Sequence, residues 1–150
     1  MKPIIPLVIA ALFATSAGAQ SAESDQMQEL FVTAGSVDLN EYRWKNRPVV
    51  VFADSDQDPA FIEQIELLQA RADDLLERDV VVLTDTDPAA RSALRLKMRP
   101  RGFMLVLVGK DGGIKLRKPF PWDVREISRS IDKMPMRQRE IREAKEAESG

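Results

Sequence analysis

The sequence predicts one α/β domain with a central mixed sheet and helices on both faces. Three observations predict it: apolar runs with strand character, helical periodicity between them, and a length of 150 residues that suits a single domain. The composition agrees, because 44% of the residues are hydrophobic and 31% are charged. A chain of this size buries roughly two thirds of its unfolded surface, so it needs no cross-links to fold.

The N-terminal residues have the pattern of a secretory signal peptide. Lys2 forms a short basic region, Ile4 to Ala14 is apolar, and Ala17-Gly18-Ala19 is a cleavage site of small residues. The apolar stretch is shorter than the roughly 20 residues that span a bilayer, which disfavours a membrane anchor. We therefore expect residues 1–19 to be removed after Ala19, leaving a periplasmic or secreted protein without a transmembrane segment.

The rest of the chain divides into three parts. Residues 20–38 are rich in Gln, Ser, Glu and Asp, and we expect a loose lead-in there. Residues 39–134 form the predicted folded domain. Residues 135–150 form a charged tail, in which Glu and Lys or Arg recur at three- and four-residue spacings that favour an exposed helix.

The first half of the domain alternates strand and helix patterns. Pro48 to Ala53 is a continuous apolar run typical of a strand buried on both faces, and Val80 to Thr84 is a second such run. Between them, Pro59 opens a helix with one apolar face, formed by Phe61, Ile65, Leu68, Ala72 and Leu75. After the second strand, Asp87-Pro88 begins a shorter helix that runs through Leu94 and Leu96.

The second half predicts a hairpin and a closing helix. Phe103 to Val108 is the third apolar run, and Ile114 to Arg117 returns after a turn at residues 110–113. Asp123 and Glu126 form a capping pair at the start of the helix, which ends before Pro135. The apolar stripe of this helix consists of Val124, Ile127, Ile131 and Met134.

The resulting order, β-α-β-α-β-β-α, matches the thioredoxin-like core, since right-handed crossovers leave few other arrangements. Particular motifs add a closer resemblance: residues 42–47 (YRWKNR), 77–79 (ERD), 102–103 (GF), 108–113 (VGKDGG), Lys115 and 131–137 (IDKMPMR). With these motifs the chain resembles, over about residues 38–142, the thioredoxin-like domain of unknown function of small exported bacterial proteins. A related P-DUDES-type, peroxiredoxin-like domain occurs in vertebrate sushi-repeat and coiled-coil-domain extracellular matrix proteins. The resemblance implies the fold and no particular activity.

The composition excludes several kinds of chemistry. The chain has no cysteine and no histidine, so thiol redox and peroxidase activity, serine triads and thiolate or imidazole metal sites are excluded. In thioredoxins and peroxiredoxins the working cysteine follows the first core strand, and here Asp54 to Pro59 occupies that place. The net charge of -2 argues against nucleic-acid binding. We expect no cofactor and no catalytic residues.

The candidate binding site is the edge of the sheet where the first two core strands end. The fold brings charged side chains together there: Asp54, Asp56, Asp58, Asp85, Asp87, Arg99 and Arg101. Asp54, Asp56 and Asp58 have the alternate spacing of a calcium loop, but Pro59 and Ile65 stand where that loop needs Gly and Glu. The simpler interpretation is that the aspartates cap helices and the arginines offset their charge, so we predict no metal site.

Two other features have a binding and a structural interpretation. Basic residues recur along residues 91–101 and on the hairpin, where they could hold an anionic polymer or form a solvated face: Arg91, Arg95, Lys97, Arg99, Arg101, Lys110, Lys115, Arg117 and Lys118. Tyr42, Trp44, Phe120 and Trp122 flank proline-bearing junctions, so packing is the simpler explanation for them than a ligand platform.

Two hypotheses on function follow. The first is a redox-inactive, non-catalytic module that binds a protein or an envelope component, which explains the missing cysteines. The alternative is a carboxylate-based hydrolase, with or without a divalent cation, at the Asp-rich edge.

Overall fold

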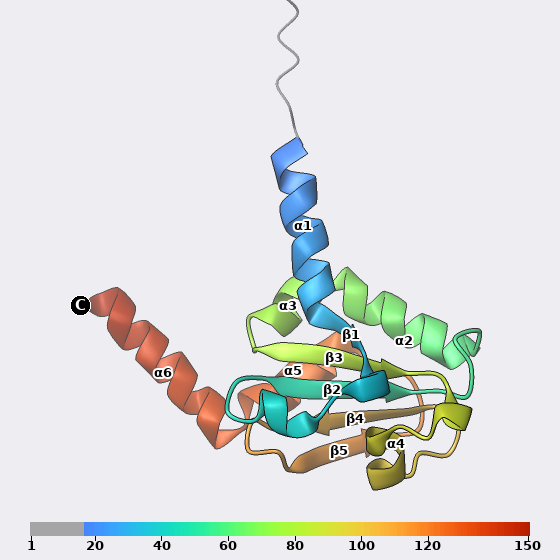
Figure 1. The fold of residues 1–150 in the computed structure, drawn as a ribbon. Helices are drawn as coiled ribbons and strands as arrows, with labels where there is room; N and C mark the ends of the chain where they lie inside the picture. Colours follow the sequence, from blue (N-terminus) through green and yellow to red (C-terminus); the bar gives the residue numbers. More distant parts are fainter. Residues whose placement is uncertain (1–16) are drawn as a thin grey trace, which may run out of the picture.

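The computed structural model describes residues 17–150, whose centre is a five-stranded sheet in the order β1-β3-β2-β4-β5 (Figure 1). β2 (Arg47–Phe52) and β3 (Val80–Asp85) are parallel neighbours. β4 (Met104–Val108) runs antiparallel to β2, and β5 (Ile114–Lys118) returns beside β4. The predicted α/β class with a mixed sheet is confirmed.

Alternate side chains of the central strands enter two cores on opposite faces of the sheet. On β2, Val49 and Val51 pack into one core, while Val50 and Phe52 pack into the other. All four side chains are fully buried. This explains why the central strands have continuous apolar runs, at residues 48–52 of β2 and 80–83 of β3, instead of alternating apolar and polar residues.

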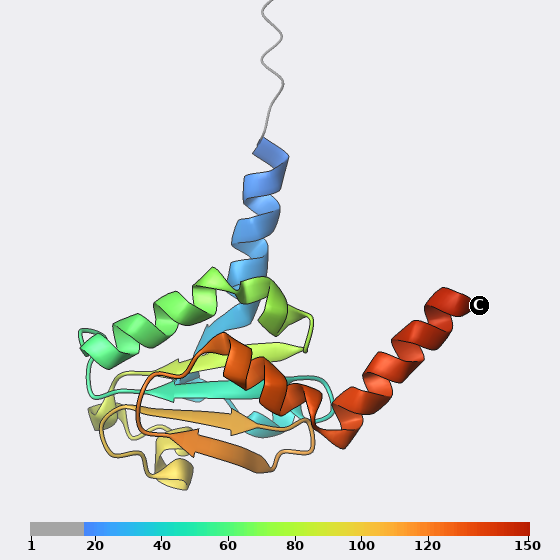
Figure 2. The same ribbon diagram turned by 180° about the vertical axis from the view of Figure 1, so that it is seen from behind.

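Helices close both cores. Figures 1 and 2 show α2, α3 and α5 on one face of the sheet and α4 on the other. The first group is α2 (Pro59–Ala70), α3 (Ala72–Leu76) and α5 (Val124–Asp132). The second face is covered by α4 (Ala93–Met98) and two short 3-10 helices, Ala34–Ser36 and Leu39–Tyr42.

The expected loose lead-in differs from the structure. Residues there form α1 (Ala17–Leu30) and a short edge strand, β1 (Phe31–Thr33). β1 pairs in parallel with β3, and the Leu30 side chain is fully buried in the core. The short apolar patch at the end of the lead-in therefore anchors it to the sheet.

Two predicted helices are interrupted. The helix from Pro59 breaks at Arg71, whose φ of -130° and ψ of 41° separate α2 from α3, yet Leu68 and Leu75 still enter one core. The helix expected from Asp87-Pro88 begins as a 3-10 turn. It restarts as α4 because the Ser92 side chain accepts a hydrogen bond from the backbone N–H of Arg95.

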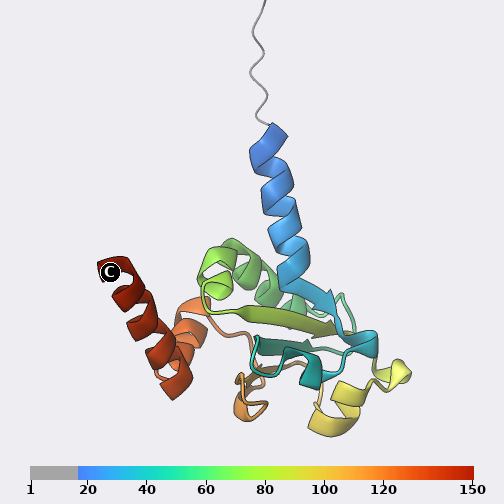
Figure 3. The ribbon, with the colours of Figure 1, turned by 60° about the vertical axis from the view of Figure 1, so that its left-hand side comes forward.

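The predicted charged C-terminal helix is confirmed as α6 (Pro135–Ser149), with Pro135 in its first turn. Figure 3 shows α1 and α6 extending away from the sheet. None of the helices within residues 17–150 is long and apolar enough to cross a membrane. Of the predicted signal peptide, residues 1–16 lie outside the described residues.

Candidate functional site

The predicted Asp-rich site lies at what we call the carboxyl-end edge, where β2 and β3 end. Asp54 and Asp56 are exposed there. Asp58 is the N-cap of α2 and accepts a hydrogen bond of 2.9 Å from the backbone N–H of Ala60. Asp58 therefore has the capping role that the sequence favoured.

Asp85 is the carboxylate at this edge with the most contacts, and it is buried. The Ser92 hydroxyl and the Arg95 guanidinium both donate to it, with an Arg95–Asp85 distance of 2.9 Å. Arg95 also donates to the backbone carbonyl of Ala53 and lies over the Phe52 ring. Asp85 thus holds the ends of β2 and β3 to α4.

Among the seven predicted residues, Asp58 and Asp85 have side-chain partners that the structure shows. Asp87, Arg99 and Arg101 are exposed, and the cation that pairs with Asp85 is Arg95, which the site prediction omitted. Within residues 17–150, no cluster of three or more acidic side chains is arranged to hold a metal ion. At the carboxyl-end edge Asp58 caps α2, Ser92 caps α4 and Asp85 pairs with Arg95, whereas the expected cap at Asp87 makes no side-chain hydrogen bond to its helix.

A larger set of ion pairs lies at the opposite edge of the sheet, the amino-end edge, where β2 and β3 begin. Arg47 is only 1% exposed, and its guanidinium donates to both carboxylate oxygens of Glu140, at 3.2 and 3.0 Å. The Lys110 ammonium donates to Glu140 at 2.7 Å and to Asp79 at 2.8 Å. Glu140 therefore ties α6 to β2 and to the hairpin.

Further ion pairs lie next to these, where α5 meets the start of α6. Arg78 donates two hydrogen bonds to Asp132, at 3.0 and 2.9 Å, and Arg137 adds a third at 3.2 Å. We call the whole set the amino-end ion network. Its cations are Arg47, Arg78, Lys110 and Arg137, and its carboxylates, equal in number, are Glu77, Asp79, Asp132 and Glu140.

The network shifts the pKa values of its groups. Burial alone would raise the pKa of Glu140, but the hydrogen bonds from Arg47 and Lys110 outweigh it and hold that pKa below its ordinary value. The pKa of Asp132 is lowered in the same way, by Arg78 and Arg137 acting against burial. Both carboxylates stay ionised at neutral pH. Their ion pairs therefore hold the start of α6 against β2, the hairpin and the end of α5.

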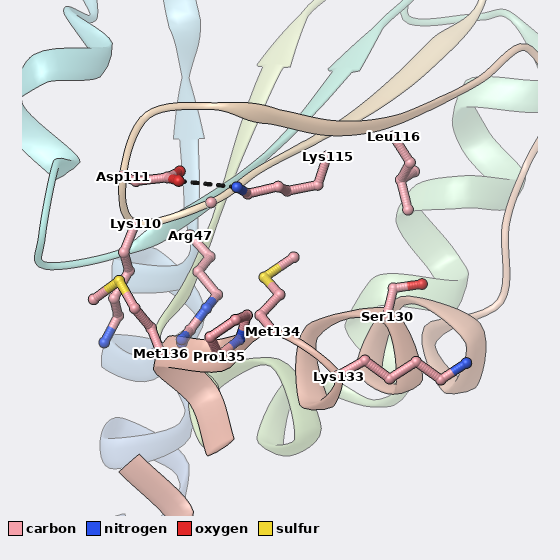
Figure 4. A pocket seen from close by; sticks show the side chains of 11 residues that line it. Arg47, Lys110, Asp111, Lys115, Leu116, Ser130, Lys133, Met134, Pro135 and Met136 are labelled. Carbon is pink, nitrogen blue, oxygen red and sulfur yellow. Dashed lines mark hydrogen bonds and ion pairs between the residues drawn. The ribbon is translucent and has the colours of Figure 1, made fainter. Parts of the chain in front are cut away.

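A groove of about 570 Å³ opens beside this network, between the β4–β5 hairpin and the junction of α5 with α6 (Figure 4). We call it the hairpin groove. Figure 4 shows Leu116 on the β5 side and Met134 on the α5–α6 side pointing into it. Its lining is Arg47, Gly109, Lys110, Asp111, Lys115, Leu116, Ser130, Lys133, Met134, Pro135 and Met136.

The hairpin turn sets the wall of the groove. Lys115 folds back over the turn to pair with Asp111 at 2.9 Å, as the dashed line in Figure 4 marks. A Cβ at Gly109 would meet Cε of Lys115 at 2.5 Å, so a side chain at this position would displace the flexible end of Lys115. The pKa of Asp111 is lowered, by the backbone N–H of Gly113 first and then by Lys115.

Two cations of the groove have unused capacity. The Nε of Arg47 is buried and has no hydrogen-bond partner in the described part of the chain. Lys133 is exposed at the rim and makes no ion pair within residues 17–150. The apolar side chains of Leu116 and Met134 and the exposed Lys133 give the groove an apolar wall and a cation at its rim, which suits a partner that is both apolar and acidic.

The prediction that the aromatic residues serve packing is wrong for Trp44 and Phe120, which are 62% and 55% exposed. Trp44 has a φ of 66°, a conformation unusual for a bulky residue. Its backbone N–H donates a hydrogen bond of 2.7 Å to the backbone carbonyl of Lys110. Trp122 does pack against the core, with Lys118 over its ring. The strained turn at Trp44 lies next to the hairpin.

Sequence reasoning missed the hairpin groove because its parts lie far apart in the chain. Arg47 and Glu140 are separated by 93 positions. The motifs that carry the family resemblance did indicate this region, because the structure places most of them around the amino-end edge. These motifs are residues 42–47, 77–79, 108–113, Lys115 and 131–137. No local spacing marked them as one site.

Comparisons with known proteins agree with this geometry. The profile of the family described as "Domain of unknown function (DUF4174)" matches residues 38–140. The chain is 26% identical over 133 residues to "Coiled-coil domain-containing protein 80" of Danio rerio. The alignment covers 69% of this chain and 15% of that protein. The chain therefore spans a small part of the length of this relative.

A solved structure shows the same fold. The reduced 2-Cys peroxiredoxin of Plasmodium vivax matches with a TM-score of 0.52 and 17% identity, covering 64% of this chain and 81% of that one. At this identity the likeness concerns the fold alone, and this chain has no cysteine. The match of the profile to residues 38–140 shows that the chain belongs to the DUF4174 family.

Proposed function

We propose that the protein is a non-catalytic binding module, exported to the periplasm or the medium, that holds a protein partner in the hairpin groove. The observation that carries this proposal is the groove itself. It combines an apolar wall with a cationic rim, and the amino-end ion network fixes its position. The partner belongs to the envelope or to the space outside it, in keeping with the signal-peptide pattern.

A preformed groove favours binding because little order has to be created when the partner arrives. Arg47 and Lys110 are buried and held by two carboxylates, so neither side chain loses much freedom on binding. Met134 and Met136 supply flexible apolar surface that adapts to the shape of a partner.

The alternative, a hydrolase at the carboxyl-end edge, has less support. Such an enzyme needs one carboxyl group with a raised pKa near another that stays ionised. Asp85 is paired with Arg95, and Asp58 caps α2, so neither is placed as a free acid or base.

Position-specific crosslinking in exporting cells tests the binding proposal. A photoreactive phenylalanine analogue is placed at Lys133 or Met136 in the groove and, as matched controls, at the exposed Ile62 on α2 and Leu96 on α4. We expect one discrete adduct from the groove positions, lost when Met134→Glu is added. Equal adducts from Ile62 and Leu96, or none from the groove, would overturn the proposal.

A further inference from the structure

β5 forms one edge of the sheet, and its outer side is available for another strand. The strand order ends at β5, and its pairing partner is β4. Ile114, Lys115 and Arg117 on this strand are exposed. In Figures 1 and 2, α4 lies near one end of this edge, where Arg117 donates to the carbonyl of Met98 at the end of α4. Unpaired N–H and C=O groups on such an edge can accept an extended peptide.

The charge of this edge selects its partner. Lys115, Arg117 and Lys118 give the five-residue strand three cations, of which Lys115 pairs with Asp111, Arg117 donates to the Met98 carbonyl and Lys118 lies over the Trp122 ring. Lys133, the residue after α5, adds another cation beside the strand. A second copy pairing through β5 would bring these cations opposite one another, and like charges in cross-strand pairs are destabilising. An acidic segment would instead be attracted.

The hairpin groove provides specificity along the same edge. Leu116 of β5 and Met134 of the α5–α6 junction both pack against the core that α5 covers, so the groove lies on the α5 side of the strand. Side chains of an added strand alternate between the two faces of the sheet. Every second side chain of a peptide beside β5 would therefore face the groove, with Lys133 at its rim.

We propose that an acidic, extended peptide segment of the partner adds to the sheet as a sixth strand beside β5. Its apolar side chains enter the hairpin groove, and its carboxylates lie on the opposite face of the sheet beside Arg117 of β5, while Lys133 at the groove rim adds to the attraction between the charges. This inference rests on the proposed function and specifies its partner: a segment that alternates acidic and apolar residues in extended conformation, bound by backbone hydrogen bonds.

Fluorescence anisotropy with defined peptides tests the mode of binding. The probe is a fluorescein-labelled octapeptide that alternates Glu and Val, titrated with the purified protein, and a Lys–Val octapeptide is the charge control. We expect saturable binding of the Glu–Val peptide that weakens with salt, and roughly tenfold or weaker binding of the Lys–Val peptide. Equal binding of both peptides, or no saturable binding of the first, would overturn the inference.

Backbone methylation separates strand addition from other binding. In a strand, successive N–H groups point to opposite sides, so the N–H groups of either the Val or the Glu residues face β5. We expect N-methylation of one set to weaken binding at least roughly tenfold, while N-methylation of the other set is tolerated. Tolerance of both methylated peptides would contradict a sixth strand.

Variants of the protein locate the contact. Leu116→Asp and Lys133→Glu should each weaken binding of the Glu–Val peptide roughly threefold or more, whereas Lys97→Glu on α4 should leave it unchanged. Circular dichroism checks folding, and if Leu116→Asp does not fold, the exposed Lys133 variant decides. Groove crosslinks without peptide binding would refute this inference alone, while absence of both would refute the proposed function as well.

Discussion

Asp85 and Glu140 are carboxylates with several partners at opposite edges of the sheet, and the comparison between them distinguishes the two edges. Asp85 is buried, and its partners, Ser92 and Arg95, belong to the adjacent α4 region. Glu140 is 25% exposed and joins Arg47 and Lys110 from β2 and the hairpin. Asp85 fixes α4 against the ends of β2 and β3, whereas Glu140 holds the start of α6 beside the hairpin groove.

The difference teaches that a cluster of charges in sequence does not identify a binding surface. At the carboxyl-end edge the charged residues are close in sequence, and those with partners cap or pin local structure. At the amino-end edge the charged residues come from distant segments and surround apolar side chains.

The largest expected effect is on Arg47. Arg47→Ala should lower the free energy of unfolding by about 3–5 kcal/mol, because it empties a buried position and leaves Glu140 with Lys110 and Arg137 as its remaining partners. Arg101→Ala, at the exposed carboxyl-end edge, should change it by less than about 0.5 kcal/mol. Urea unfolding measures both, and equal losses would contradict the distinction between the edges.

The next effect is at Asp85. Asp85→Asn removes the charge that Arg95 faces and should cost about 2 kcal/mol, whereas Asp54→Asn at the same edge should be nearly neutral. Thermal unfolding with and without millimolar calcium measures both variants and the parent protein. A calcium-dependent stabilisation of the parent that Asp54→Asn abolishes would make this edge a cation site and revive the hydrolase hypothesis.

The pH dependence of stability reports on Glu140. Its pKa is lower in the folded state than in the unfolded state, so its contribution is present above the unfolded pKa and is lost as pH falls through the folded pKa. Glu140→Gln should therefore be about 1–2 kcal/mol less stable than the parent at pH 7, and the gap should narrow on acidification.

The matched control for Glu140→Gln is Glu146→Gln, an exposed position on the same helix. This variant should follow the parent protein at every pH in the same urea titrations. If Glu140→Gln also followed the parent at every pH, the pairs that Glu140 makes with Arg47 and Lys110 would not be holding α6.

The smallest effect concerns the turn at Trp44. Because its φ is 66°, Trp44→Gly should be about 0.5–1 kcal/mol more stable than Trp44→Ala. At the neighbouring Lys45, which is also exposed but has no positive φ, the order should be reversed or absent. Chemical unfolding of the four variants gives both differences, and the same order at the two positions would argue against strain at Trp44.

Sequence patterns predicted what depends on near neighbours. The apolar runs of β2, β3 and β4 were visible because both of their faces are buried, and β5 was visible from the turn that precedes it. The caps at Asp58 and Asp123 were visible from spacing. The interruption at Arg71 and the edge strand β1 were missed. β1 depends on pairing with β3, and three residues carry too little pattern to show it.

The candidate site at the carboxyl-end edge remains a prediction, and the hairpin groove was not visible from the sequence. Seven charged residues near two strand ends formed the hypothesis, but the most buried ion pair there uses Arg95, and the groove depends on Arg47 meeting Glu140. Contacts between segments so far apart depend on the angle between α5 and α6 at Pro135. Local sequence patterns do not predict that angle.

The measurement that tests the central claim most directly is a titration of the isotope-labelled protein with the Glu–Val octapeptide, followed by amide NMR shifts. We predict that the shifts concentrate on residues 109–118 and 130–136, around the hairpin groove and β5. Shifts concentrated on residues 54–58 and 85–87 would contradict the account and return the binding site to the carboxyl-end edge.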